Sequence, residues 1–233
     1  TGGSFVASNY NISYVAGSLV VSAATPTFIW SNASTTYSPG GTLVLTAPTV
    51  TLGGSGTWAY SSGDTTVATV SGSTLSILKS GTSVITATFT PSSSNFVSGA
   101  TVTMTLTVGQ ATNTITWSQL LGNAVYGSSA ITLSATATSG SVTYSTNDSN
   151  ICSVSGSTLS LISVGSCTVT ANQSGNTNYA AATAVAKTFS ITQAANSITF
   201  GAAPTGLTFG ETGQTRTVTA TATNGTIQFS TTS

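Results

Sequence analysis

The feature that most constrains the fold of this chain is an internal repeat. The segment VSGSTLSIL at residues 70–78 recurs as VSGSTLSLI at residues 154–162, 84 residues further on. A third copy begins with Ile198-Thr-Phe200, which repeats Ile115-Thr-Trp117. Repetition at a fixed period of this length indicates that each copy folds as one supersecondary unit or module.

The repeat divides the sequence into four segments. Residues 1–24 are predicted to be the C-terminal tail of a preceding module, because they resemble the close of the first full repeat. Residues 25–111 and 112–195 are the two full repeats, and residues 196–233 start a third. The third copy stops before its VSGSTL segment, so we expect this sequence to be a window from a longer chain.

Short alternating runs fill each repeat. In the segment 101–108, the apolar residues Val102, Met104, Leu106 and Val108 alternate with threonines, which is the period of a half-buried strand. Gly-rich turns separate such runs, and about seven strands fit in each repeat, as in an immunoglobulin-like sandwich. The sequence therefore predicts an all-β chain of tandem immunoglobulin-like β-sandwich modules of about 84 residues each.

Charge is nearly absent from this chain. Only 3% of the residues are charged, three basic and three acidic, and the net charge is zero. Nucleic-acid binding and docking on anionic membranes both need basic clusters, so neither partner is expected. No apolar run reaches the ~18 residues of a membrane helix, so direct membrane insertion is not expected either.

Candidate catalytic and metal-binding groups are equally scarce. The sequence has no histidine, and Asp64, Asp148 and Glu211 lie far apart. Histidine-based catalysis, paired-carboxylate catalysis and calcium cages all need groups that this spacing does not bring together. We therefore expect no enzyme activity and no catalytic, cofactor-binding or metal-binding residues, and we expect no cofactor.

Three segments of the second repeat carry a family resemblance: residues 144–162, 165–171 and 175–179. They resemble bacterial immunoglobulin-like repeats of large surface adhesins, and the resemblance extends over residues 25–233. It implies a secreted or cell-surface protein. In such proteins the repeats usually serve as spacers, and their sequence does not identify the ligand.

The resemblance implies a mechanical role, namely a structural stalk or spacer of an extracellular bacterial adhesin or surface fibre. Its expected partners are neighbouring immunoglobulin-like modules of the same chain and, in a fibre, other copies. The low charge also suits an alternative, a self-assembling filament subunit, because little repulsion opposes association. A carbohydrate-binding module is a third alternative, which an exposed aromatic platform would support.

Cys152 and Cys167 are the only cysteines, and both lie in the second repeat. Paired cysteines at these positions recur in the resembled family, and a disulfide suits an exported protein. Two free buried thiols are the alternative. The first repeat has Ala68 and Ser83 at these positions, so the bridge is an option within the fold and not a requirement.

Two further features have open interpretations. Trp30, Trp117 and Phe200 occupy equivalent positions, where aromatic rings serve core or inter-module packing, or stack on a sugar when exposed. Lys187 lies on the apolar phase of its strand, where the first repeat has Met104. It either reaches solvent at a strand edge or forms a Lys–Asn isopeptide crosslink.

Overall fold

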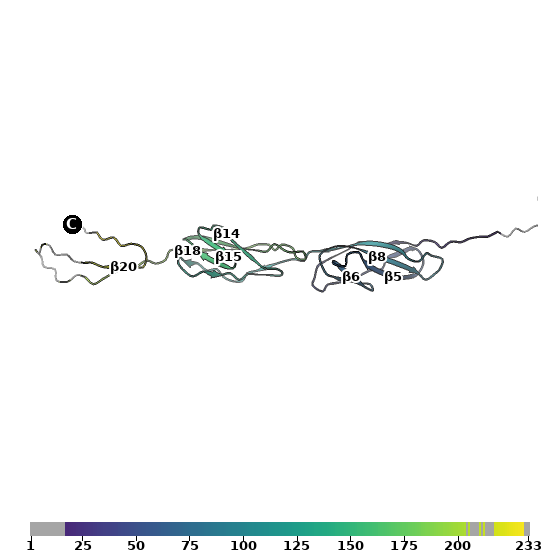
Figure 1. The fold of residues 1–233 in the computed structure, drawn as a ribbon, viewed down its shortest axis with the longest axis horizontal. Helices are drawn as coiled ribbons and strands as arrows, with labels where there is room; N and C mark the ends of the chain where they lie inside the picture. The colour runs from purple at the N-terminus through teal and green to yellow at the C-terminus, as the bar shows by residue number, and fades with distance from the viewer. Residues whose placement is uncertain (1–16, 204, 206–209, 211, 213–216, 231–233) are drawn as a thin grey trace, which may run out of the picture. The chain divides into compact units, whose positions relative to one another are not determined.

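The computed structural model describes residues 17–203, 205, 210, 212 and 217–230. These residues form β-strands, turns and loops and no helix. Two compact units follow each other along the described chain. The first runs to Ala111 and also takes Thr177–Tyr179, and the second takes Thr112–Asn176 and the residues from Ala180 on. Figure 1 labels strands of both units. The sequence prediction of an all-β, immunoglobulin-like fold is confirmed.

The first unit is a sandwich of two main sheets. One has the strand order β2-β9-β8-β5 and the other β3-β7-β6, with a separate pair β1-β4. All pairings are antiparallel except that of β2 with β9. The strands are β1 (Thr27–Ile29), β2 (Ala33–Thr36), β3 (Thr42–Val44), β4 (Thr49–Leu52), β5 (Gly56–Ser62), β6 (Ala68–Ser71), β7 (Thr74–Ile77), β8 (Gly81–Pro91) and β9 (Ala100–Gly109).

The second unit repeats this arrangement. Its sheets have the orders β11-β18-β17-β14 and β12-β16-β15, with the pair β10-β13, and β11 runs parallel to β18. The strands are β10 (Ile115–Thr116), β11 (Ala124–Val125), β12 (Ile131–Thr132), β13 (Thr136–Ala137), β14 (Thr143–Thr146), β15 (Cys152–Ser155), β16 (Thr158–Leu161), β17 (Gly165–Asn172) and β18 (Val185–Thr192).

The first strand of each unit changes sheets at its tryptophan. In the first unit, β1 pairs with β4, and after Trp30 the chain crosses to pair as β2 with β9. In the second, β10 pairs with β13, and after Trp117 the chain crosses to pair as β11 with β18. In each unit the crossover therefore links the separate pair of strands to the four-stranded sheet.

Strand alternation produces the two cores. In β9 the side chains of Met104, Leu106 and Val108 are buried and the threonines between them are exposed, as the period-2 pattern predicts. Each unit buries one such cluster. The first contains Leu45, Val67, Ala68, Leu75, Ile77, Ile85, Met104, Leu106 and Val108. The second contains Ile115, Trp117, Leu133, Cys152, Leu159, Cys167, Val169, Ala171, Phe189 and Ile191.

One end of the sandwich is built differently in the two units. In the first unit, Phe28, Trp58 and Phe89 form an aromatic trio with ring centroids 4.8–5.3 Å apart. In the second unit, Asn113 and Gln173 are buried there, and the Asn113 amide donates to Gln173 Oε1 at 2.6 Å. A buried amide pair of this kind needs its hydrogen bonds satisfied, and both side chains bond further to backbone groups.

Thr177–Tyr179 belongs to the first unit, although its sequence position lies in the second repeat. The Ala111 N–H donates to the Asn178 carbonyl at 2.8 Å, and the Ser80 N–H donates to the Asn178 side chain at 2.9 Å. The Tyr179 ring packs edge-on against Tyr37 with centroids 5.7 Å apart. Beyond the second repeat, the described residues form one antiparallel pair, β19 (Ile198–Phe200) with β20 (Ala220–Ala222).

Candidate functional site

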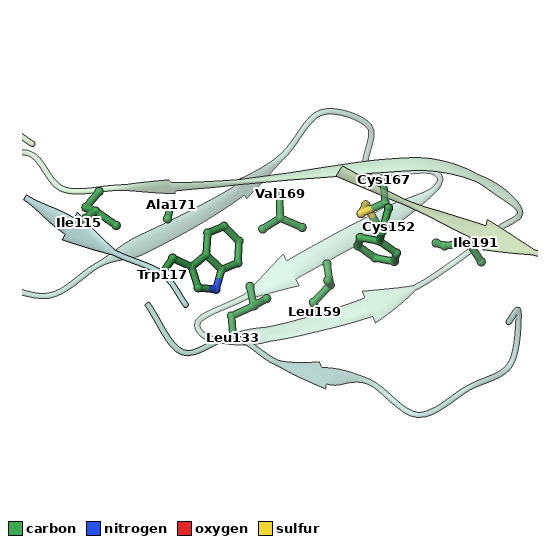
Figure 2. Packing of buried hydrophobic residues seen from close by; sticks show 10 residues of the cluster. Ile115, Trp117, Leu133, Cys152, Leu159, Cys167, Val169, Ala171 and Ile191 are labelled. Atoms are coloured by element: carbon green, nitrogen blue, oxygen red, sulfur yellow. A yellow bond between two sulfur atoms is a disulfide. The ribbon is translucent and has the colours of Figure 1, made fainter. Parts of the chain in front are cut away.

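A disulfide joins the two sheets of the second unit. Cys152 begins β15 in one sheet and Cys167 lies in β17 of the other, with their Cα atoms 6.0 Å apart. Both side chains are fully buried. Figure 2 shows the bridge toward one end of the core and Trp117 toward the other, with Leu133, Leu159 and Val169 between them. The bridge therefore links the sheets directly through the core.

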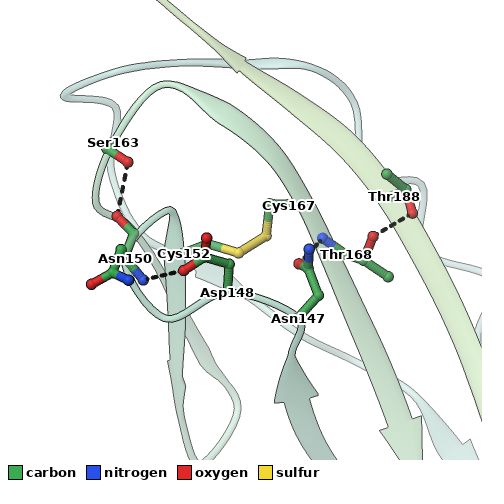
Figure 3. Close-up of a disulfide and its surroundings, with 8 residues drawn as sticks. All are labelled: Asn147, Asp148, Asn150, Cys152, Ser163, Cys167, Thr168 and Thr188. Carbon is green, nitrogen blue, oxygen red and sulfur yellow. Dashed lines mark hydrogen bonds between the residues drawn. A yellow bond between two sulfur atoms is a disulfide. The ribbon is translucent and has the colours of Figure 1, made fainter.

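A tight turn at residues 148–150 leads into β15 and places Cys152 at its start. The Asp148 carboxylate accepts the Asn150 N–H at 2.9 Å, and the Asp148 carbonyl accepts the Cys152 N–H at 3.1 Å. Asn147 accepts the Thr168 N–H at 2.7 Å, next to Cys167 (Figure 3). Side-chain oxygens of Asp and Asn that bond backbone N–H groups nearby are typical of such turns. Hydrogen bonds of this turn therefore hold the backbone at Cys152 and next to Cys167.

The first unit has the same turn without the bridge. Asp64 accepts both the N–H and the hydroxyl of Thr66, at 2.9 and 2.7 Å. The hydrogen bond from the Thr66 hydroxyl, followed by that from its N–H, lowers the pKa of the Asp64 carboxyl. The Ser83 hydroxyl, at the position of Cys167, bonds Ser62 at 2.9 Å and accepts the Asp64 N–H at 3.0 Å. These hydrogen bonds tie Ser83 to β5 of its own sheet and to the turn after it, and they do not join the two sheets as the disulfide does in the second unit.

Gln119 closes the crossover of the second unit. Its Oε1 accepts the Trp117 indole N–H at 3.1 Å and the Ser134 N–H at 3.0 Å, and its Nε2 donates to the Thr132 carbonyl at 2.7 Å. These two backbone groups lie on the edge of β12 that faces away from β16. The side-chain amide therefore pairs with this strand edge as a neighbouring strand would.

Lys187 contributes to the same place. Its ammonium donates to the Gln119 carbonyl and lies 5.2 Å from the centroid of the Trp117 ring. This geometry fits a lysine whose apolar stem lies along the core while its charge is held by a carbonyl and an aromatic face. Of the two interpretations of Lys187, a crosslink to asparagine does not describe this contact, and a half-buried lysine that extends its charge away from the core remains the prediction.

Removing the Gln119 amide is expected to destabilise the second unit. Gln119→Ala leaves the indole N–H of Trp117, a side chain that is only 7% exposed, and two backbone groups without their partner. We expect the free energy of unfolding of this unit to fall by about 2 kcal/mol. Denaturant titration followed by hydrogen-exchange mass spectrometry would measure it. Ser118→Ala, which removes an exposed hydroxyl next door, should change little, and an equal loss in both variants would contradict the assignment.

The first unit has a groove at its crossover. Trp30 is half-buried, packs against Tyr60 with centroids 5.7 Å apart, and donates its indole N–H to the Thr46 carbonyl at 2.8 Å. A hollow of about 440 Å³ beside it is lined by Ile29–Ala33, Leu43–Ala47, Thr49 and Met104. The link from the tryptophan to the tyrosine after the parallel strand is two residues shorter here (Trp30 to Tyr37) than in the second unit (Trp117 to Tyr126).

The three equivalent aromatic residues thus have different surroundings. Trp117 is a core residue, Trp30 is a half-buried groove wall, and Phe200 in β19 is 66% exposed. The packing and sugar-stacking interpretations of these residues stay predictions, since Trp30 lines a groove and Phe200 is largely exposed. The predicted module tail at residues 1–24 lies largely outside the described residues, as does part of the segment 196–233.

Chemistry-bearing side chains do not gather elsewhere in the described structure. In the described residues, no three of His, Cys, Asp and Glu lie together as a metal site would require. Asp64 and Asp148 each hold their own turn, as the hydrogen bonds above show. Within the same ranges, no helix has the length and hydropathy needed to cross a membrane.

Sequence reasoning missed Gln119 and the groove. The signal that was present is the difference between the repeats after the tryptophan, Trp30-Ser-Asn-Ala in the first and Trp117-Ser-Gln-Leu-Leu-Gly in the second. It also missed the buried Asn113–Gln173 pair, since amides at these positions read as turn residues.

Comparisons with known proteins add the following. No family model and no curated protein matches this sequence. Among solved structures, Drosophila N-cadherin EC1-3 is similar at 12% identity over 75% of this chain and 70% of that chain, with a TM-score of 0.27. Drosophila N-cadherin EC1-4 is similar at 9% identity over 75% and 52%, with a TM-score of 0.26.

A third similar structure is a C-terminal 282-residue fragment of intimin, in complex with the intimin-binding domain of the translocated intimin receptor. It is 16% identical over 61% of this chain and 53% of that chain, with a TM-score of 0.23. This chain spans about half the length of the intimin fragment and of N-cadherin EC1-4.

Proposed function

We propose that this chain is a mechanical spacer, a stalk segment of an extracellular bacterial adhesin or surface fibre. The observation that carries the proposal is the parallel pairing of the crossover strand with the last strand in each unit, β2 with β9 and β11 with β18. The resemblance of the repeats to those of surface adhesins supports it, and so does the buried disulfide, which suits an exported protein.

Parallel pairing of these strands determines how a unit resists a pull. Tension along the chain enters each unit ahead of β2 or β11 and leaves it after β9 or β18. It therefore drags two neighbouring parallel strands in opposite directions along their length. The hydrogen bonds between them, over Ala33–Thr36 with Leu106–Gly109 in the first unit, are then loaded together in shear and not one after another. Such a unit therefore has a low unfolding rate under force. The unfolding rate determines how long a tether holds under load.

The disulfide adds a second mechanical property to the spacer. It joins β15 to β17, so the 15 residue steps between Cys152 and Cys167 cannot extend when the unit unfolds. The second unit would then release less chain than the first when it yields. A stalk with such a unit therefore extends less when that unit unfolds under load.

Single-molecule force spectroscopy on the full chain tests the proposal. We expect separate unfolding events for the two units, and reduction should lengthen the event of the second unit by about 50 Å, from roughly 3.6 Å per released residue. The event of the first unit should keep its length. Unfolding of both units at forces too small to resolve would contradict a mechanical role, and specific binding of a glycan array would favour the carbohydrate-binding alternative.

A proline pair isolates the contribution of the parallel strands. The Tyr37 N–H donates to the Gly109 carbonyl at 2.8 Å, so by alternation the Thr35 N–H also faces β9 and the Ser34 N–H faces away. Thr35→Pro should therefore lower the unfolding force of the first unit and leave the second unchanged. Ser34→Pro is the matched control and should lower that force much less, because it removes no bond of the pair. Equal forces in the two variants would show that this pairing does not carry the load.

A further inference from the structure

The edge of β3 beside Trp30 offers backbone hydrogen-bonding groups to the groove. The Leu45 N–H donates to Ser73 and the Gly41 carbonyl accepts from Ile77, so this set of groups faces β7. By strand alternation, the N–H and C=O groups of Val44 and Thr46 face the groove. β3 is an edge strand of its sheet, and the Thr46 carbonyl is taken by the Trp30 indole.

The second unit shows what such an edge binds. There the equivalents of the Val44 carbonyl and the Thr46 N–H are the Thr132 carbonyl and the Ser134 N–H, because Leu45 and Leu133 make the same bond to the neighbouring strand. The Gln119 carboxamide bonds both groups. In the first unit, Asn32 stands after the tryptophan and the serine, and its side chain instead accepts the Thr105 N–H at 2.8 Å. The edge is therefore built to receive an amide that the first unit does not supply from this position.

The groove is apolar behind this edge. Met104 and Leu45 form its buried floor, and Ile29 and Val44 are 64% and 68% exposed at its rim. None of the lining residues is charged. The occupant that fits is therefore an uncharged, extended peptide segment that carries an aliphatic side chain and presents the N–H and C=O of one residue to β3.

This chain itself carries such a segment. Leu120 is 91% exposed in the crossover of the second unit, between Gln119 and Leu121, and the whole stretch Ser118–Gly122 is uncharged. Gln119 and Leu121 are held in place, the first by its amide bonds and the second by packing on the core. Leu120 is thus presented on a fixed loop, and the near absence of charge on the chain means that little repulsion opposes the approach of a second copy.

We infer that the groove beside Trp30 binds the Leu120 loop of a second copy of this chain. The leucine side chain enters the groove, and the N–H and C=O of the leucine itself bond the Val44 carbonyl and the Thr46 N–H, as one residue of a neighbouring strand would. Groove and loop lie on different units, so the contact is heterologous and leaves one groove and one loop open at the ends of every assembly. The contact is much smaller than the ~1,600 Å² of a standard stable interface, so single contacts are weak.

Sedimentation equilibrium of the full chain from about 10 µM to about 1 mM tests this inference over the range expected of weak contacts. The average mass should rise with concentration without levelling at a dimer. Leu120→Asn should weaken association about tenfold or more, as the loss of one buried leucine predicts. Thr46→Pro, which removes the groove-facing N–H and keeps the bonds of β3 to β7, should do the same. Ile162→Asn, at an exposed apolar side chain elsewhere on the second unit, should not.

Mixing the two weakened variants gives the decisive result. Leu120→Asn keeps an intact groove and Thr46→Pro keeps an intact loop, so the mixture should form a one-to-one dimer and nothing larger, while each variant alone stays monomeric. Circular dichroism of each variant confirms that its units are folded. A wild-type chain that stays monomeric at 1 mM overturns the inference. So does association that both variants leave intact, or a sugar or unrelated peptide that binds beside Trp30 without self-association.

Discussion

Replacing Cys152 by alanine and Cys167 by serine is expected to lower the free energy of unfolding of the second unit by about 3 kcal/mol. The bridge closes a loop of 15 residue steps, and its loss frees the unfolded chain. The variant introduces the residue types that the first unit has at the equivalent buried positions, Ala68 and Ser83. For a domain of this size the melting temperature should fall by about 15 °C. Hydrogen-exchange mass spectrometry reports the two units separately and would measure the difference.

Reduction of the wild-type chain is the control for this prediction. A reductant strong enough to open the bridge should lower the stability of the second unit by a similar amount, and it should leave the first unit, which has no cysteine, unchanged. Equal losses in both units would mean that the variant acts through something other than the bridge. Alkylation without reduction should label neither cysteine, and two labelled thiols would contradict the bond itself.

Gly56→Ala is expected to destabilise the first unit by about 3 kcal/mol. Gly56 begins β5 opposite Pro91, and a Cβ atom there would lie 2.4 Å from Phe89 Cζ and 2.4 Å from the Thr90 carbonyl oxygen. The ring of Phe89 is locked between Phe28 and Trp58, and the carbonyl belongs to the backbone of β8, so neither can move away cheaply. Because Trp58 belongs to this trio, tryptophan fluorescence during denaturant unfolding would follow the change.

Gly109→Ala is the matched control in the same unit. A Cβ atom at Gly109 meets only the Thr35 carbonyl oxygen, at an ordinary contact distance of 3.7 Å. Its stability should therefore stay within about 0.5 kcal/mol of the wild type. If the Gly56→Ala and Gly109→Ala variants have the same free energy of unfolding, the close packing of β5 against Phe89 does not contribute to the stability of this unit as we expect.

Much of the fold was readable from the sequence because the repeat and the strand period are both local patterns. The apolar phase of residues 101–108 predicted the buried face of β9, and the match of residues 70–78 with 154–162 predicted that the two repeats fold alike, as the hairpins β6–β7 and β15–β16 do. Such patterns need no knowledge of distant contacts. The immunoglobulin-like fold class followed from them.

The crossover could not be predicted in the same way. Whether an amide after the tryptophan turns toward β12, as Gln119 does, or toward β9, as Asn32 does, depends on one methylene and on a link that differs by two residues. The sheet-changing strands are only two to four residues long, so their alternation carries little signal. Lys187 was placed on the apolar phase correctly, but its partner Gln119 is 68 positions away, and no pattern connects them.

The unlike ends of the two cores bear on how neighbouring repeats fold without exchanging strands. Tandem modules of similar sequence are prone to misassembly, in which a strand of one copy completes the sheet of the next. Here an exchanged β8 would bring the Phe89 ring to the place where Gln173 meets Asn113, so the buried asparagine amide would lose its hydrogen bond to Gln173 and keep only those to Ser139. An exchanged β17 would put the Gln173 amide between Phe28 and Trp58. Each hybrid buries an N–H group that lacks a hydrogen bond, so the aromatic trio and the amide pair disfavour the exchange of strands between the two repeats.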